Sequence, residues 1–292
     1  LKVYGVLVGK KPIIFTNNDS AYETAIEFKK NKILPIVIDS RSNPESEIIR
    51  EARDMGIDIK FSHVVVAAKG YKKVNSAEIA KISEDKKDIG KIENISCDCI
   101  CVSGFWTPTI HLASQSGNKT KFNEDIDAFV PGKSKQLETS LGSANGIFTL
   151  EETLKNSFKA GYEISKKITN KDSELNIPQV SEKKHAKHDK FWCVPLPKDK
   201  NYKRFLDFQN DVAVTDVELA LREGYRSIEH VKRYTTLGMA TDQGKTSNLN
   251  GLQLVSNIEN KIVPSVGHTT FRPPYTPVTI GAIVGREIGQ HS

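Results

Sequence analysis

The chain has 292 residues, of which 38% are hydrophobic and 27% charged, which provides enough apolar material for a folded core and excludes a disordered polymer. At about 150 residues per domain, this length predicts two domains. No apolar run approaches the roughly 18 to 20 residues that span a bilayer, and the N-terminus lacks a signal-peptide pattern. We therefore expect a soluble globular protein with no membrane partner.

The formal net charge is +6, from 42 Lys and Arg against 36 Asp and Glu. Because the excess is scattered Lys rather than a basic face with interleaved aromatic residues, we expect no nucleic-acid partner. Three of the four cysteines are Cys97, Cys99 and Cys101, which favours a reducing, cytoplasmic compartment. Leu1 is not an initiator methionine and residues 285–289 run on as if into another element, so we expect a segment of a longer polypeptide.

The first sixty residues alternate between strand and helix patterns. Strands are predicted at 12–16, 34–39 and 57–61, with helices at 21–30 and 45–55 between them. This β-α-β-α-β order indicates a parallel sheet with right-handed crossovers. Additional strands are predicted at 63–68 and 74–82, followed by a Lys-rich loop at 84–91.

A further strand at 97–102 would place the thiols of Cys97, Cys99 and Cys101 on one face, because side chains alternate along a strand. A zinc or iron–sulfur site needs a fourth ligand and usually draws its ligands from tight loops. We therefore favour core packing of these thiols and expect no metal.

The second half of the chain reads as helices separated by turns. A glycine-rich turn at 142–146 precedes a long amphipathic helix predicted at 148–168. Residues 169–203 carry several prolines and a Lys/His cluster, which predicts a linker with solvated His185 and His188. Two helices at 214–223 and 227–237, separated by Gly224, are typical of a small helical module.

Two turns are candidates for binding a dinucleotide. The turn from Asn17 to Ala21 occupies the place of a Gly-x-Gly-x-x-Gly fingerprint, with Asp39 where a ribose-binding acid would stand, but all three glycines are missing. We therefore favour a structural Rossmann-like unit with an empty or vestigial pocket. The turn at 142–146 is the better candidate because a helix start offers N–H donors and a positive dipole end, although ordinary capping explains it equally well.

The sequence Asp242-Gln243-Gly244-Lys245-Thr246-Ser247 contains Gly-Lys-Thr, but Met239 stands where a nucleoside-triphosphate P-loop needs a glycine, and no strand precedes it. This loop can still hold a phosphate through Lys245, Thr246 and its backbone amides.

Several segments together resemble the alpha subunit family of heterotetrameric sarcosine oxidase. They are residues 15–22, 102–108, 207–212, 226–236, 242–246 and 270–277. The resemblance implies an α/β chain with four parts. These are a Rossmann-like three-layer domain of the pyridine-nucleotide-disulfide oxidoreductase type (1–168), a linker (169–203), a small α-helical module like a [2Fe–2S] ferredoxin-like domain (204–265), and the start of a connection to a downstream folate-binding domain (266–292).

The resemblance also implies cofactor contacts. NAD, the dinucleotide of that family, would be contacted in part by Gly142, Ser143, Ala144, Thr149 and Leu150. Lys245, Thr246 and Arg272 are expected, on charge and loop position, to hold the phosphate of flavin mononucleotide (FMN) at a subunit interface. The four cysteine ligands of the related [2Fe–2S] domains correspond here to Asp207, Gln209, Asp242 and Ser247, so no cluster can form.

The function implied by the resemblance is oxidative demethylation of sarcosine in a complex with beta, gamma and delta subunits. A flavin in the beta subunit would take the hydride, and tetrahydrofolate would capture the one-carbon unit, with FAD and folate bound outside this segment. The segment would supply scaffold, part of the NAD site and flavin-interface surface, with no catalytic residue of its own. The alternatives are a subunit of a related opine, proline or dimethylglycine dehydrogenase, or a purely structural interaction module.

Overall fold

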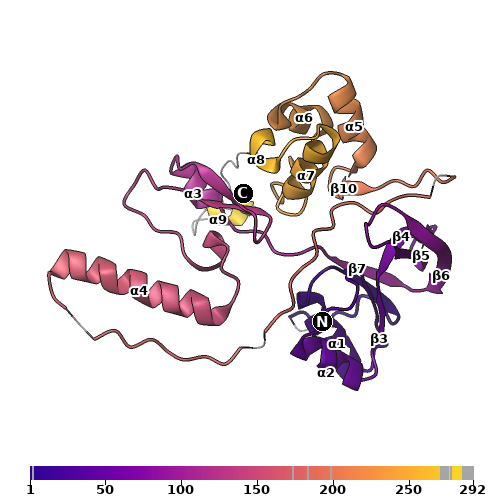
Figure 1. Ribbon diagram of the computed structural model, residues 1–292, viewed down its shortest axis with the longest axis horizontal. Helices are drawn as coiled ribbons and strands as arrows, with labels where there is room; N and C mark the ends of the chain where they lie inside the picture. The colour runs from indigo at the N-terminus through magenta and orange to yellow at the C-terminus, as the bar shows by residue number, and fades with distance from the viewer. Residues whose placement is uncertain are drawn as a thin grey trace, which may run out of the picture. The chain divides into compact units, whose positions relative to one another are not determined.

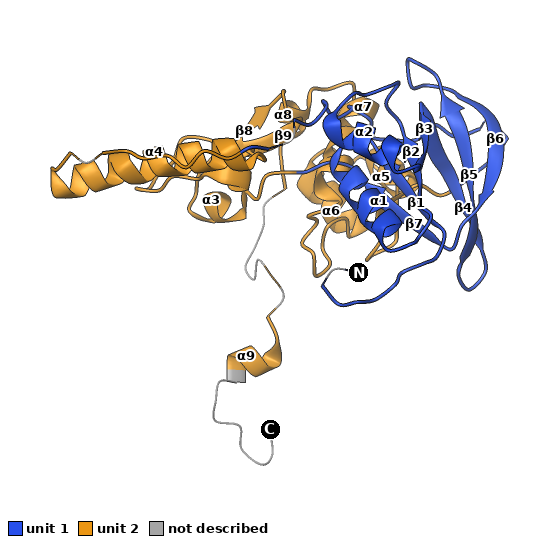
Figure 2. Ribbon diagram, turned by 90° about the horizontal axis from the view of Figure 1, so that it is seen from below, with its two compact units in different colours: residues 1–106, 181–202 blue, residues 107–180, 203–292 orange. Residues whose placement is uncertain are grey.

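The computed structural model describes residues 1, 3–172, 174–182, 184–197, 199–269, 276 and 278–284. The chain divides into two compact units, which Figure 2 distinguishes by colour. Unit 1 comprises Leu1–Trp106 and Ser181–Tyr202, and unit 2 comprises Thr107–Val180 and Lys203–Ser292. Within the described ranges, no helix combines the length and the apolar character that crossing a membrane requires.

Unit 1 is built around a four-stranded parallel sheet in the order β3-β2-β1-β7. Its strands are β1 (Pro12–Thr16), β2 (Ile36–Asp39), β3 (Asp58–Phe61) and β7 (Cys99–Ser103), and its crossover helices are α1 (Ser20–Lys30) and α2 (Glu47–Asp54). All neighbouring strands run parallel, as the strand and helix pattern predicts. Thr16 pairs with both Asp39 and Ser103, so the carboxyl ends of three strands meet at one edge.

Alternating side chains of β1 and β2 build separate cores on the two faces of this sheet. Ile14 and Val37 pack with α1 and α2, whereas Ile13 and Ile38 pack on the other face. That face is covered by an antiparallel sheet of β4 (His63–Gly70), β5 (Val74–Ile82) and β6 (Ile89–Ser96) (Figures 1 and 2). The predicted three-layer Rossmann-like fold is therefore confirmed.

The expectation that three thiols share one face of a strand is wrong. The strand begins only at Cys99, and Cys97 lies before it, buried in the core on the side of the antiparallel sheet. Cys101 packs on the opposite, helical side. Side chains do not alternate regularly from Cys97 to Cys101 because the chain bends at Asp98. The Asp98 carboxylate accepts hydrogen bonds from the backbone N–H groups of Lys10 and Lys11.

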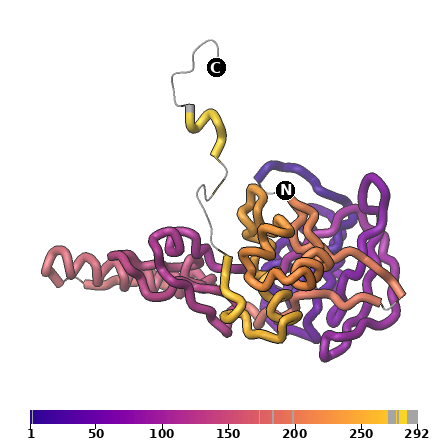
Figure 3. The backbone as a smooth tube through the Cα atoms, turned by 90° about the horizontal axis from the view of Figure 1, so that it is seen from above, coloured from indigo at the N-terminus to yellow at the C-terminus, as the bar shows by residue number. Residues whose placement is uncertain are grey.

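Unit 2 contains a hairpin, a long helix and a helical module, and Figure 3 traces its backbone in chain order. The first part comprises α3 (His111–Gln115), β8 (Thr120–Asn123), β9 (Ala128–Pro131), a 3₁₀ turn (Gly142–Asn145) and α4 (Leu150–Thr169). The second comprises β10 (Phe205–Asp207), β11 (Val212–Ala213), α5 (Val214–Arg222), α6 (Ile228–Thr235), α7 (Asn248–Ile258), α8 (Val263–Val266) and α9 (Ile280–Val284). The helices predicted on either side of Gly224 are confirmed as α5 and α6.

The unit boundaries differ from the expected domains. The expected first domain, 1–168, divides after Trp106, and all of residues 107–168 group with the helical module in unit 2. Part of the expected linker, Ser181–Tyr202, belongs to unit 1. The physical reason is that polar groups of this segment bond to the edge of the parallel sheet instead of to water.

A buried ionic network ties the ends of β1 and β2 together. The Arg41 guanidinium lies 2.8 Å from an Asp39 carboxylate oxygen and 2.8 Å from one of Asp19, and these three side chains are at most 6% exposed. The Tyr22 hydroxyl donates to Asp39 at 2.7 Å. Burial lowers the pKa of Arg41, but its hydrogen bonds to Asp39 and Asp19 outweigh this and raise the net pKa. One buried cation therefore compensates two buried carboxylates.

Replacing Arg41 tests this network. Arg41→Gln leaves Asp19 and Asp39 buried without a countercharge, so we expect the free energy of opening of β1 and β2 to fall by about 3 to 5 kcal/mol. Hydrogen exchange of the peptides that carry these strands, read by mass spectrometry, measures it. The matched control is Arg53→Gln, whose exposed pair with Glu45 should contribute less than about 1 kcal/mol. Equal effects of the two substitutions would contradict the network's role.

Candidate functional site

The carboxyl edge of the parallel sheet is where open α/β sheets bind nucleotides, but here it is closed by polar side chains. The Asn18 side chain donates to the Ser103 carbonyl oxygen at 3.1 Å and accepts from the Ser20 hydroxyl at 2.6 Å. Asn17, Asn18 and Asp19 are all buried. The turn that lacks the fingerprint glycines therefore fills the crevice between β1 and β7 with its own hydrogen bonds.

A segment from the far end of unit 1, residues 185–191, completes this closure, and we name it the closing segment. The Ala186 N–H donates to an Asp19 carboxylate oxygen at 2.6 Å. Asn17 exchanges two hydrogen bonds with the backbone of Asp189, at 2.8 and 3.0 Å. The expectation of a solvated His188 is wrong, since its ring stacks on Phe105 with centroids 3.7 Å apart.

Asp39, the expected ribose-binding position, is fully buried and already accepts hydrogen bonds from Tyr22 and Arg41. Burial, followed by the nearby charge of Asp39, raises the pKa of Tyr22. A ribose would have to displace this network. The geometry thus supports the interpretation of a vestigial dinucleotide pocket in unit 1.

The residues expected to contact NAD lie together at the start of α4. Gly142, Ser143 and Ala144 form the 3₁₀ turn, and the extended Thr149 caps the helix that begins at Leu150. The helix therefore starts two residues later than predicted, because Thr149 has φ −88° and ψ 142°. This arrangement supplies the N–H groups and the positive dipole end that a pyrophosphate requires.

Two features of this turn have a structural explanation. Gly146 has φ +78°, a backbone conformation that other residues rarely adopt, and a Cβ there would lie 2.6 Å from Cδ1 of Ile126, so the turn itself favours glycine. Glu151 and Glu152 occupy the first turn of α4, and the Thr149 hydroxyl donates to Glu152 at 3.3 Å. These carboxylates interact favourably with the positive end of the α4 dipole, which is the same end that would attract a phosphate.

The four positions that correspond to cluster ligands gather around one loop of the helical module, residues 238–248. Asp207 accepts the Gly238 N–H at 2.8 Å, and Asp242 accepts the Gly244 N–H at 3.1 Å. Gln209 accepts the Thr241 hydroxyl at 3.0 Å, and Ser247 is fully buried. Hydrogen bonds of these polar side chains thus hold the loop in place. In the part of the chain that the structure describes, no group of three or more potential ligands could hold a metal ion.

The same loop positions Lys245 and Thr246, whereas Arg272 lies outside the described residues. Gly238 and Gly244 both have positive φ, and a Cβ at either would lie 2.1 to 2.2 Å from the Asn248 side-chain oxygen. The Thr246 hydroxyl donates to Asp242 at 3.1 Å. The Gly-Lys-Thr sequence is therefore a tight structural turn, with a carboxylate beside its hydroxyl.

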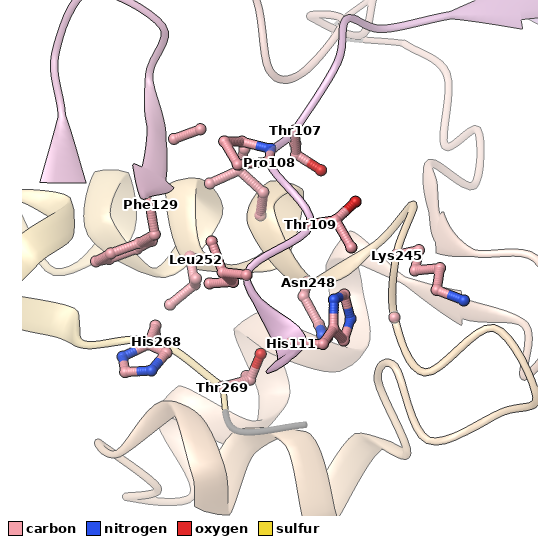
Figure 4. A pocket seen from close by; sticks show the side chains of 14 residues that line it. Thr107, Pro108, Thr109, His111, Phe129, Lys245, Asn248, Leu252, His268 and Thr269 are labelled. Carbon is pink, nitrogen blue, oxygen red and sulfur yellow. The ribbon is translucent and has the colours of Figure 1, made fainter. Parts of the chain in front are cut away.

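A cavity of about 160 Å³ lies inside unit 2, beside this loop (Figure 4). It is lined by residues 107–111, by β9, by the loop and first turn of α7, and by residues 268–269. Of the residues singled out from the sequence for cofactor binding, only Lys245 lines it. His111, which no sequence pattern identified, is 5% exposed and has its ring at the cavity wall (Figure 4).

Burial lowers the pKa of both histidines that line this cavity. Burial, followed by the charge of Lys245, lowers the pKa of His111 to about 4. Burial also lowers the pKa of His268, although the charge of Glu229 opposes the shift. The His268 ring lies 3.3 Å from the Thr120 hydroxyl and 5.5 Å, centroid to centroid, from Phe129.

The depressed pKa of His111 predicts acid sensitivity. Between an unfolded-state pKa near 6.5 and the folded value of about 4, the unfolded chain binds a proton that the folded chain does not, so stability falls as the pH is lowered through this window and levels off below it. The loss should reach about 2 kcal/mol at pH 5 and about 3 kcal/mol below pH 4. Chemical denaturation at pH 7 and pH 5 measures it. His111→Phe should remove most of the dependence and the exposed His230→Gln should keep it, and an undiminished dependence in His111→Phe would refute the assignment.

Residues 201–286 match the family described as the sarcosine oxidase A3 domain. The sarcosine oxidase subunit alpha of Rhizobium meliloti (strain 1021) is 35% identical over 300 residues, which cover 100% of this chain and 28% of that protein. The sarcosine oxidase subunit alpha of Corynebacterium sp. (strain P-1) is 31% identical over 299 residues, which cover 99% of this chain and 30% of that protein.

Among solved structures, L-proline dehydrogenase from P. horikoshii aligns with a TM-score of 0.62 at 19% identity, covering 96% of this chain and 51% of that chain. At this identity the likeness shows a shared fold. The chain spans less than a third of the length of the curated relatives it matches. It is, over its whole length, a relative of a segment of the sarcosine oxidase alpha subunits.

Proposed function

We propose that this chain is part of the alpha subunit of a sarcosine oxidase that removes the methyl group of sarcosine oxidatively, in complex with beta, gamma and delta subunits. The observation that carries the proposal is the 35% identity that extends over the entire chain. A flavin in the beta subunit takes the hydride, and tetrahydrofolate bound elsewhere captures the one-carbon unit. This chain contributes scaffold, part of an NAD site and a wall of a flavin site, and we assign it no catalytic residue.

The substrate assignment is tested on the complex copurified with this chain. We expect sarcosine to drive oxygen consumption faster than proline, dimethylglycine or an opine. Faster turnover of one of these three, with an artificial electron acceptor, would favour the related dehydrogenases instead. If the complex turns over sarcosine equally well without this chain, the chain takes no part in the reaction, and the alternative of a purely structural interaction module is favoured.

NAD is proposed to bind at the start of α4 rather than at the edge of the parallel sheet. Two observations support this choice. The edge in unit 1 is closed by the closing segment and by the Asp19–Arg41–Asp39 network. The turn at Gly142–Asn145 and the cap Thr149 instead present a helix start beside glycine backbone, which is the arrangement that binds pyrophosphate in other dinucleotide folds.

A carboxylate placed in this turn should weaken NAD binding. We expect Ala144→Glu to raise the dissociation constant of NAD at least tenfold in the full-length subunit, measured by calorimetry, because it repels the pyrophosphate. Asn156→Glu adds the same charge further along α4, at a half-buried position, and should leave affinity within about twofold. Unchanged affinity in Ala144→Glu would exclude this site for NAD.

FMN is proposed to place its phosphate near Lys245 and Thr246, with Arg272 as a third contact. The support is the Lys245 charge in the loop that precedes α7, whose first turn carries no acidic residue. The Asp242 carboxylate, which accepts the Thr246 hydroxyl, works against this placement because it repels a phosphate. The phosphate would therefore rely on Lys245 and Arg272 more than on Thr246.

The scaffold role is supported by the exposed apolar face of α4. None of the side chains of this helix is buried. Its large apolar side chains are therefore exposed to solvent: Leu150, Phe158, Ile164 and Ile168 are 51%, 38%, 48% and 76% exposed. Their spacing of three to four residues, completed by Leu154 and Gly161, places them on one stripe. Such a stripe is stabilised by contact with another surface, which we propose belongs to the rest of the alpha subunit.

The stripe predicts a large difference between two charge substitutions on α4. Phe158→Glu should lower the melting temperature of the full-length subunit by several degrees, because a carboxylate would be desolvated at the contact. Asn156→Glu, on the opposite side of the helix, should change it little. Equal melting temperatures for the two variants would show that the stripe faces solvent in the intact protein.

A further inference from the structure

Two thiols lie side by side on β7, at the edge of the parallel sheet. Cys99 and Cys101 are alternate residues of this strand, so their side chains leave it on the same side. Their sulfur atoms lie 3.8 Å apart. Both side chains are half-buried, and neither belongs to a disulfide. The pair is therefore a dithiol that the proposed function does not use.

The separation of the two sulfur atoms fits a shared ion better than a disulfide. In a disulfide the sulfur atoms approach to about 2.05 Å, and the Cα atoms usually lie about 4.4 to 6.8 Å apart. Alternate residues of a strand are about 6.6 Å apart, at the far end of that range, so formation of the bond would distort β7. Two thiolates that bind one ion at about 2.3 Å lie about 3.8 Å apart at a tetrahedral angle and about 4.6 Å apart in a linear site.

The ligand set selects the kind of ion. Among the residues that the structure describes, no third His, Cys, Asp or Glu joins the two thiols to form a metal-binding group. Structural zinc sites and iron–sulfur clusters, which take four protein ligands, therefore do not fit here. Thiolates select soft ions such as Cu(I), and Cu(I) forms stable complexes with two thiolates alone.

The surroundings of the pair favour thiols over a disulfide. Cys101 packs against the apolar core that α1 and α2 form with the sheet. Burial, followed by the neighbouring Cys99 thiol, raises the pKa of Cys101 to about 12. Because the thiolate is the form that reacts with oxidants, a protonated Cys101 is oxidised slowly. The two sulfur atoms therefore remain available as ligands.

We propose that Cys99 and Cys101 bind one Cu(I) ion as a two-coordinate site in unit 1. Uptake of the ion breaks two S–H bonds, forms two Cu–S bonds and releases two protons, while copper and sulfur keep their oxidation states. The proposal does not depend on the proposed function, because it uses the thiols of unit 1 alone.

Differential alkylation of the intact protein tests the site. The protein is titrated anaerobically with Cu(I), supplied as its acetonitrile complex, and the alkylation of each cysteine by iodoacetamide is read by peptide mass spectrometry. Cys99 and Cys101 should be protected together, at a Cu(I) concentration about tenfold lower than the one that protects Cys193. Cys193 is half-buried in another segment and reports the binding of Cu(I) to a single thiol. Zn(II) should not protect the pair at that concentration.

Substitution of each thiol identifies the pair as one site. Cys99→Ser should abolish the protection of Cys101, and Cys101→Ser should abolish that of Cys99. Cys193→Ser is the matched control and should leave both protected.

The proposal is overturned if Cu(I) protects only one of the two thiols, or protects both no better than Cys193. It is also overturned if Cys101 stays protected in Cys99→Ser, if Zn(II) protects the pair equally well, or if the reduced protein forms a Cys99–Cys101 disulfide when Cu(I) is added. The titration of the wild-type protein keeps the test valid should a variant fail to fold.

Discussion

A single buried guanidinium determines what unit 1 can do. Arg41 pairs with Asp39 at the end of β2 and with Asp19 at the start of α1, and burial of these charges is tolerated because they are paired and hydrogen-bonded. Asp19 also accepts the Ala186 N–H, which fixes the closing segment on the sheet. The stability of the fold and the closure of the nucleotide edge therefore depend on the same ions.

This closure explains why a Rossmann-like fold carries no dinucleotide fingerprint here. Three asparagine and aspartate side chains fill the turn where glycines would admit a pyrophosphate. The helical module shows a parallel substitution. Asp207 and Asp242 hold the loop at 238–248 through its backbone N–H groups. In both places, polar side chains hold the local backbone through hydrogen bonds.

The sequence predicted the layers well because they follow from local patterns. Strand alternation at Ile13 and Ile14 and helix periodicity in α1 and α2 identify the parallel sheet, and the resemblance identified the helical module. The closing segment could not be predicted, since its contacts join residues 167 to 172 positions apart and its Lys/His composition is that of a solvated linker. The prediction that the three thiols share one face was wrong because the strand begins at Cys99, two residues later than predicted. His111 carried no motif, because its role comes from burial.

We propose that the dinucleotide binds at the start of α4 because the sheet edge of unit 1 is closed. Photolabelling of the intact protein with an azido analogue of NAD, followed by peptide mapping, tests it most directly. We expect the label in the peptide that spans residues 142–150. Label concentrated in peptides that span residues 12–41 would contradict it, because that edge would then be open to the nucleotide.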